Sequence, residues 1–132
     1  MTAKSNYLEG KIIEHVLRNV SYTSPSTVYL ALHTANPDED GSGTELSGNG
    51  YSRKAVTFGA HSDGVCKNTS TETFTASNGN FGAVTHFGIW DGPTAGGSPD
   101  NLLYYGSLVT SQTVNDGDSI VFSPNSITIQ EQ

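Results

Sequence analysis

The feature that most constrains this chain is a series of short segments in which apolar and polar residues alternate. In residues 27–33, Val28, Leu30 and Leu32 point to one side of an extended chain, which predicts a strand with one buried face. The segment 84–90 carries bulky residues on both sides, so we expect it at the centre of a sheet. The same reasoning predicts further strands over residues 51–58, 65–74 (as one strand or two), 102–109, 119–122 and 126–130.

Turn-forming residues separate these segments. Gly, Ser, Thr and Asn together supply 56 of the 132 residues, a composition that disfavours helices and favours strands joined by turns. The run Asn-Asp-Gly-Asp at 115–118 predicts a tight turn between two strands. We therefore expect a single domain over residues 1–132 with a mainly β fold. Its predicted architecture is an antiparallel, jelly-roll-like β-sandwich of about seven or eight strands.

One segment has helical periodicity instead. Its apolar residues fall on one face of a helix, and they are Leu8, Ile12, Ile13, Val16 and Leu17. Asn6, followed three residues later by Glu9, fits an N-terminal cap. The sequence thus predicts an N-terminal α-helix over about residues 6–18, and we expect its apolar stripe to dock on the sheet.

Charge and hydropathy exclude several classes of protein. Six Lys and Arg against 13 Asp and Glu give a net charge of −7, which disfavours direct binding to nucleic acid. No apolar run is long enough to cross a membrane, and the first residues do not form an apolar signal core, so synthesis in a cytoplasm is expected. The lone cysteine, Cys66, excludes an internal disulfide.

The sequence holds no arrangement typical of catalysis, of a metal centre or of a cofactor site. The four histidines lack metal-ligand spacing, and neither a nucleophile elbow nor a phosphate-binding glycine loop is present. The acidic run 36–41 is similar to the first half of a calcium loop, but Ser47 stands where that loop needs a glutamate. A solvated acidic loop is the favoured interpretation, and a weakly bound cation is the alternative. We predict a protein with no catalytic residues, no cofactor and no metal.

Several stretches together resemble a known family. They cover residues 5–18, 25–32, 48–53, 85–91, 101–106 and 114–122, and the most specific are the Gly-Tyr-Ser-Arg run at 50–53 and the Phe-Gly-Ile-Trp-Asp run at 87–91. Over nearly the whole chain, this pattern is similar to that of small structural proteins carried on tailed bacteriophage particles. Such proteins are described as tail-fibre-like or as capsid cement and decoration proteins. The resemblance implies a virion component made in the host cytoplasm.

The function expected on this basis is that of a capsid decoration, or cement, protein on the capsid surface. It would bind across subunits of the major capsid protein and stabilise the shell as a homo-oligomer, either a dimer or a trimer, without contacting nucleic acid or a membrane. The alternative is a tail- or fibre-associated adaptor or receptor-binding protein. A third hypothesis is a carbohydrate-active protein, either a lectin-like binding module or a small glycosidase.

Loops on a rigid sandwich are its adaptable parts, so we expect loops 35–50 and 92–100, together with the N-terminal segment, to supply many of the partner contacts. Aromatic side chains and one arginine are the candidate interface residues: Tyr7, Tyr51, Arg53, Trp90 and Tyr105. For Arg53, a local salt bridge is an equal alternative to one between subunits.

Overall fold

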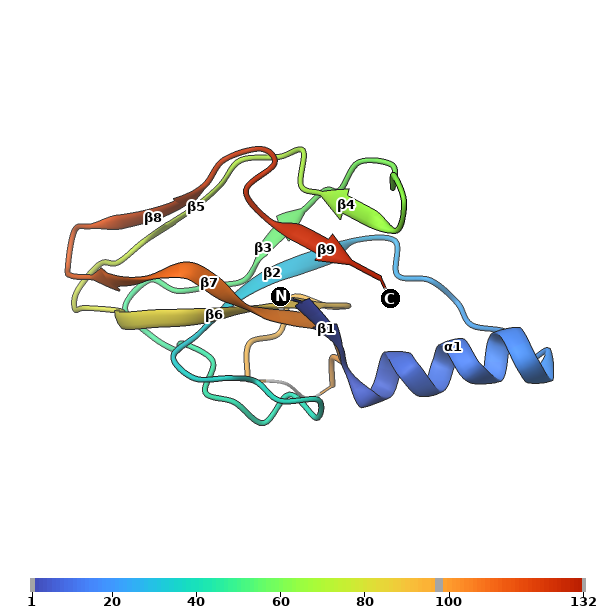
Figure 1. Ribbon diagram of the computed structural model, residues 1–132. Coiled ribbons are helices and arrows are strands. Elements are labelled where there is room, and N and C mark those ends of the chain that lie inside the picture. The colour runs from blue at the N-terminus through green and yellow to red at the C-terminus, as the bar shows by residue number, and fades with distance from the viewer. Residues whose placement is uncertain (1, 97–98, 132) are drawn as a thin grey trace.

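The computed structural model describes residues 2–96 and 99–131 (Figure 1). Its elements in chain order are β1 (Thr2–Lys4), α1 (Asn6–Arg18), β2 (Val28–His33), β3 (Lys54–Val56), β4 (Val65–Lys67), β5 (Glu72–Thr75), β6 (Gly82–Trp90), β7 (Leu102–Val114), β8 (Ser119–Phe122) and β9 (Thr128–Gln130). The fold is mainly β with one helix, and it is antiparallel and sandwich-like without closing into a barrel. The predicted fold class is therefore confirmed.

β6 occupies the centre of a five-stranded sheet with the order β1-β7-β6-β2-β3. Leu30 of β2 pairs with Ile89 of β6, and Ile89 pairs in turn with Tyr104 of β7. The last four residues of β6, 87–90, are all buried. The bulk on both sides of this segment requires cover on both faces, which only a central position provides.

Two short pairs of strands, β4–β9 and β5–β8, lie over one face of the large sheet (Figure 1). Phe74 of β5 and Phe122 of β8 meet edge to face, with ring centres 6.0 Å apart. Both belong to one buried cluster with Leu30 and Ile89 of the large sheet. The main core thus lies between the two layers, where apolar side chains of both are removed from water.

Helix α1 covers the predicted range, but its cap and its docking differ from expectation. Ser5, not Asn6, is the N-cap, and its hydroxyl oxygen accepts the Leu8 N–H at 3.2 Å. The Ser5 N–H in turn donates to the Leu103 carbonyl at 2.9 Å, which fixes the start of the helix against β7. Beyond its first turn the helix projects past the sheet (Figure 1), and Leu8 is its only buried residue. The expectation that the whole apolar stripe docks on the sheet is therefore wrong.

The strands also depart from the sequence pattern in places. Only Lys54–Val56 of the predicted strand 51–58 is a strand, because Tyr51 and Arg53 join a polar cluster at the end of the sheet. The segment 65–74 divides into β4 and β5, one of the two predicted outcomes. The sequence did not predict β1, because Thr2–Lys4 has no apolar alternation. In the part of the chain that the structure describes, no helix is long and apolar enough to cross a membrane.

Candidate functional site

The predicted interface residues gather around the end of β6. The guanidinium carbon of Arg53 lies 4.1 Å from the centre of the Trp90 ring, and Tyr105 packs against the small buried cluster that contains Trp90. Tyr7 lines the same hollow as Trp90, and Tyr51 reaches the group through a carboxylate that it shares with Arg53. We call these five residues, together with Glu45 and Asp100, the Trp90 region.

Arg53 is the centre of the hydrogen bonding in this region, and its side chain is fully buried. Its Nε and Nη2 atoms donate to the two carboxylate oxygens of Glu45 at 2.9 and 2.8 Å, which makes a bidentate ion pair. Nη1 donates to the Gly92 carbonyl at 2.9 Å and to Asp100 Oδ2 at 3.4 Å. The local salt bridge, one of the two alternatives for Arg53, is present. It ties together loops 34–53 and 91–101, which are far apart in sequence.

Glu45 is held by several donors besides Arg53. The Tyr51 hydroxyl donates to Oε2 at 2.6 Å, and the Gly96 N–H donates to Oε1 at 3.0 Å. Burial by itself raises the pKa of Glu45, but the hydrogen bonds from Arg53, Tyr51 and Gly96 outweigh burial and leave the pKa below its ordinary value. Burial, followed by the Glu45 charge, raises the pKa of the Tyr51 hydroxyl. At neutral pH the carboxylate is therefore ionised and the phenol is protonated.

The Trp90 ring is enclosed and does not form an exposed platform. Its residue is 3% exposed, Arg53 lies over the ring, and the His33 ring stacks in a nearly parallel plane with centres 6.2 Å apart. A stacking site for sugars needs an aromatic face open to solvent. Trp90 therefore acts here as the anchor to which Arg53 and the two loops are attached.

A hollow of about 330 Å³ opens beside Trp90, between the start of α1 and the two loops. Glu39, Asp40 and Asp100 line it together with Tyr7. Tyr105 lies near Glu39, because burial first and then the Glu39 charge raise the pKa of its hydroxyl. The hollow is negatively charged and partly aromatic, so it suits basic or hydrogen-bond-donating groups.

The acidic run 36–41 forms a turn that satisfies its own backbone. Asp40 Oδ1 accepts the Ser42 N–H at 2.9 Å, and Asn36 Oδ1 accepts the Asp38 N–H at 3.0 Å. These are the bonds of an ordinary solvated turn. Among the described residues, no group of three or more His, Cys, Asp and Glu side chains is placed to hold a metal ion.

Sequence reasoning missed the carboxylates that complete the Trp90 region. Glu45 lies in a glycine- and serine-rich acidic loop, where a solvated position was the natural interpretation. It forms an isolated β-bridge with the buried His33, and Leu46 beside it is buried as well. The only signal for this in the sequence is an apolar residue directly after Glu45.

The fold and the Trp90 region are those of a β-structured protein in which buried polar side chains hold loops together. A comparison with family models is more specific, because residues 3–130 match the family described as podophage GP4 fiber I protein gp80. The chain therefore belongs to this family, which confirms the resemblance to structural proteins of tailed bacteriophage virions. A search of the curated proteins found no match.

Proposed function

We propose that this chain is a structural component of a bacteriophage fibre, where it joins neighbouring subunits by binding and without catalysis. The observation that carries the proposal is the family match over residues 3–130, whose description names a fibre protein of a podophage. That description favours the tail- or fibre-associated alternative over the capsid decoration protein that the sequence first suggested. The partners, including further copies of this chain, belong to the proposal.

The Trp90 region supports a binding role because it holds two long loops in fixed positions. Arg53 takes partners from both loops, and the side chains of its ion pair with Glu45 are 0% and 6% exposed. Loops that are already fixed lose little conformational entropy when they meet a partner. The acidic hollow between these loops then offers a negatively charged contact surface to basic groups on a neighbour.

Particles that lack this chain provide the test. The proposal predicts that they adsorb poorly to the host while their filled heads keep the thermal stability of the wild type. Supplying the chain in trans is expected to restore adsorption. Heads that lose their DNA at lower temperature, with adsorption unchanged, would contradict the proposal and support the capsid decoration alternative.

A further inference from the structure

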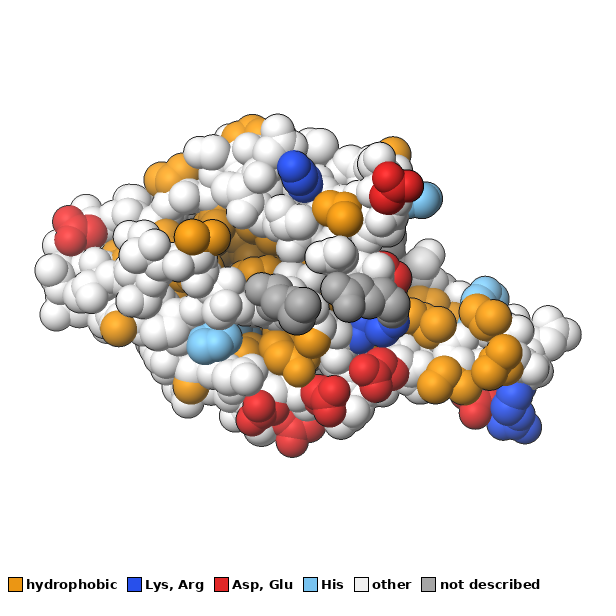
Figure 2. All heavy atoms as spheres, in the orientation of Figure 1, with side chains coloured by type: hydrophobic (Ala, Val, Ile, Leu, Met, Phe, Trp, Pro, Cys, Tyr) orange, Lys and Arg blue, Asp and Glu red, His pale blue; other side chains and the backbone are white. Residues whose placement is uncertain are grey.

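The second half of α1 presents an apolar stripe to solvent. Ile13, Val16 and Leu17 are 54%, 69% and 76% exposed, and Val20, just after the helix, is exposed as well. Figure 2 shows these hydrophobic side chains gathered on the part of the molecule that projects from the body. A surface helix normally turns such a stripe toward a core, so this stripe indicates a contact with another molecule.

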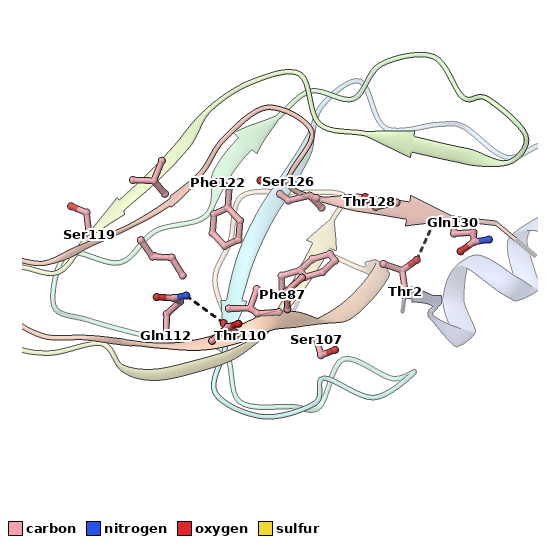
Figure 3. Close-up of a pocket in the computed structure, with 15 residues that line it drawn as sticks. Thr2, Phe87, Ser107, Thr110, Gln112, Ser119, Phe122, Ser126, Thr128 and Gln130 are labelled. Carbon is pink, nitrogen blue, oxygen red and sulfur yellow. Dashed lines mark hydrogen bonds between the residues drawn. The ribbon is translucent and has the colours of Figure 1, made fainter.

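A groove of about 730 Å³ forms a second surface, on the open side of the sandwich between β7 and β8, and apolar residues line it together with Ser, Thr and Gln residues. Phe87 and Phe122 point into it from the two layers (Figure 3), and the hollow is visible in Figure 2. Val109 stands exposed at its edge. Val121 instead points to the outer face of β8, because Ile120 and Phe122 on either side of it are the buried residues. Within the described residues, the large exposed hydrophobic side chains other than Val121 lie either at the groove or at the end of α1.

Charge favours contact between copies at these two surfaces. The chain has a net charge of −7, yet none of the 15 described residues that line the groove is charged. Two copies repel one another least where both contact surfaces are neutral. Asp118 directly precedes the groove residue Ser119. Arg18, which also pairs with Glu14 at 2.7 Å, lies exposed in the last turn of α1. A helix seated with its C-terminal end toward Asp118 therefore brings opposite charges together.

The part of β7 beyond its pairing with β1 suits a docked helix better than an added strand. Val84 of β6 pairs with Gln112 and His86 pairs with Ser107, so the four residues 108–111 stand opposite the single residue Thr85. This bulge breaks the regular spacing that a further strand needs for pairing along the edge. A helix satisfies its own backbone hydrogen bonds and requires only an apolar groove.

We propose that α1 of one copy seats its Ile13, Val16 and Leu17 face in the β7–β8 groove of a second copy. The donating and accepting surfaces differ, so the contact is head to tail, and each copy both gives a helix and receives one. Repetition of this contact produces a ring or a linear array of copies.

Analytical ultracentrifugation of the purified chain tests this contact. We expect the wild type to associate with rising concentration, and we expect Leu17→Glu and Val109→Glu each to weaken association at least about tenfold. Ala60→Glu, at an exposed position outside both surfaces, adds the same charge and is the control. Leu17 and Val109 are too exposed for their replacement to threaten folding.

Mixing the two variants distinguishes this arrangement from others. Leu17→Glu keeps an intact groove and Val109→Glu keeps an intact helix, so an equimolar mixture is expected to form a one-to-one pair that grows no further. Loss of association in only one variant would mean symmetric pairing and overturn the proposal, as would a wild type that stays monomeric. A wild type that captures only a foreign protein would overturn it as well. Because the test needs only purified chain, its failure leaves the fibre role untouched.

Discussion

The guanidinium of Arg53 lies over the Trp90 ring with its carbon 4.1 Å from the ring centre, while its nitrogens hold Glu45 through two hydrogen bonds. One side chain thus combines a cation–π contact with a bidentate ion pair away from water. A buried pair of this kind depends on both partners, because removing one leaves the other charge buried and uncompensated. In the isolated chain, Arg53 therefore holds two loops in contact with the end of the sheet.

Replacing Arg53 is expected to destabilise the whole chain. Arg53→Ala leaves the Glu45 carboxylate buried without its cation, which costs about 3–5 kcal/mol of the free energy of unfolding. The control is Arg18→Ala, which removes the exposed helix pair with Glu14 and is expected to cost about 0.5 kcal/mol or less. Urea denaturation measures the free energy of unfolding of both variants. An equal loss in the two would show that the ion pair of Arg53 does not stabilise the fold.

Replacing two glycines by alanine is expected to change the stability of the chain in opposite directions. A Cβ at Gly88 would lie 2.8 Å from Trp90 Nε1 and 3.0 Å from His33 Nε2, so Gly88→Ala is expected to cost about 1–3 kcal/mol through overpacking. Gly10, in the middle of α1, has open space where its Cβ would lie. Gly10→Ala is therefore expected to stabilise the chain by up to about 1 kcal/mol. Thermal denaturation of the two variants checks the signs, and a stabilised Gly88→Ala would contradict the close packing around Trp90.

Because His33 is buried, we expect the stability of the chain to decline in mildly acidic solution. Burial lowers its pKa, and the neighbouring Glu45 charge only partly opposes burial. Below about pH 6.5 the unfolded chain takes up a proton on this histidine that the folded chain does not. The free energy of unfolding then falls with pH, by at most about 1.4 kcal/mol per pH unit, and is unaffected by this group above about pH 6.5.

Denaturation at several pH values between about 7.5 and 5 tests this dependence. His33→Gln should flatten the dependence, and His61→Gln, at an exposed position, should leave it unchanged. Glu45, with its lowered pKa, contributes a further loss only below about pH 4.3, outside the measured range. A wild-type stability that stays constant down to pH 5 would contradict the burial of a neutral His33.

Asn68 joins the segment before β5 to the connection between β8 and β9. Its Nδ2 donates to the Ser70 and Ser123 carbonyls at 2.9 Å each, and its Oδ1 accepts the Ile127 N–H at 2.8 Å. Asn68→Asp replaces both donated bonds by a carboxylate facing two carbonyls, which is expected to cost at least about 2 kcal/mol. The exposed Asn78→Asp is the control, and similar denaturation midpoints for the two variants would contradict a structural role of Asn68.

The acidic hollow predicts a variant that folds normally and assembles poorly. Glu39→Lys reverses a charge at an exposed position, so we expect less than about 0.5 kcal/mol change in stability. If basic groups of a neighbour occupy the hollow, particles complemented with this variant should carry less of the chain than particles complemented with the wild type. Quantitative mass spectrometry of purified particles measures this amount, and Asp63→Lys, at an exposed position just before β4 and outside the hollow, is the matched control. Equal incorporation of all three chains would exclude the hollow as a docking site.

The strand pattern predicted much of the fold because alternation records which faces are buried. The central position of β6 followed from bulk on both sides of residues 84–90, and the helix range followed from the spacing of Leu8 through Leu17. The docking of α1 could not be predicted in this way. Helical periodicity shows that α1 has an apolar stripe but not which part of the protein the stripe contacts. That depends on where β1 holds the first turn of the helix, and β1 itself has no apolar pattern.

The candidate site was predicted only in part, for a related reason. Trp90, Arg53 and Tyr51 stood out as residue types that often bind partners, and the structure brings them together. Their carboxylate partners come from loops whose composition indicates solvent exposure. Glu45 and Asp100 lose most of their contact with water only when two loops distant in sequence meet at Arg53, and no local sequence pattern indicates that the loops meet. Whether these residues also contact another subunit stays a prediction.

The position of the chain in an intact virion tests the central claim most directly. Cryo-electron microscopy of particles, with this chain traced in the density, is predicted to find it within a fibre, present only there and in contact with neighbouring fibre subunits. Density for the chain spread over the junctions between major capsid subunits would contradict the account.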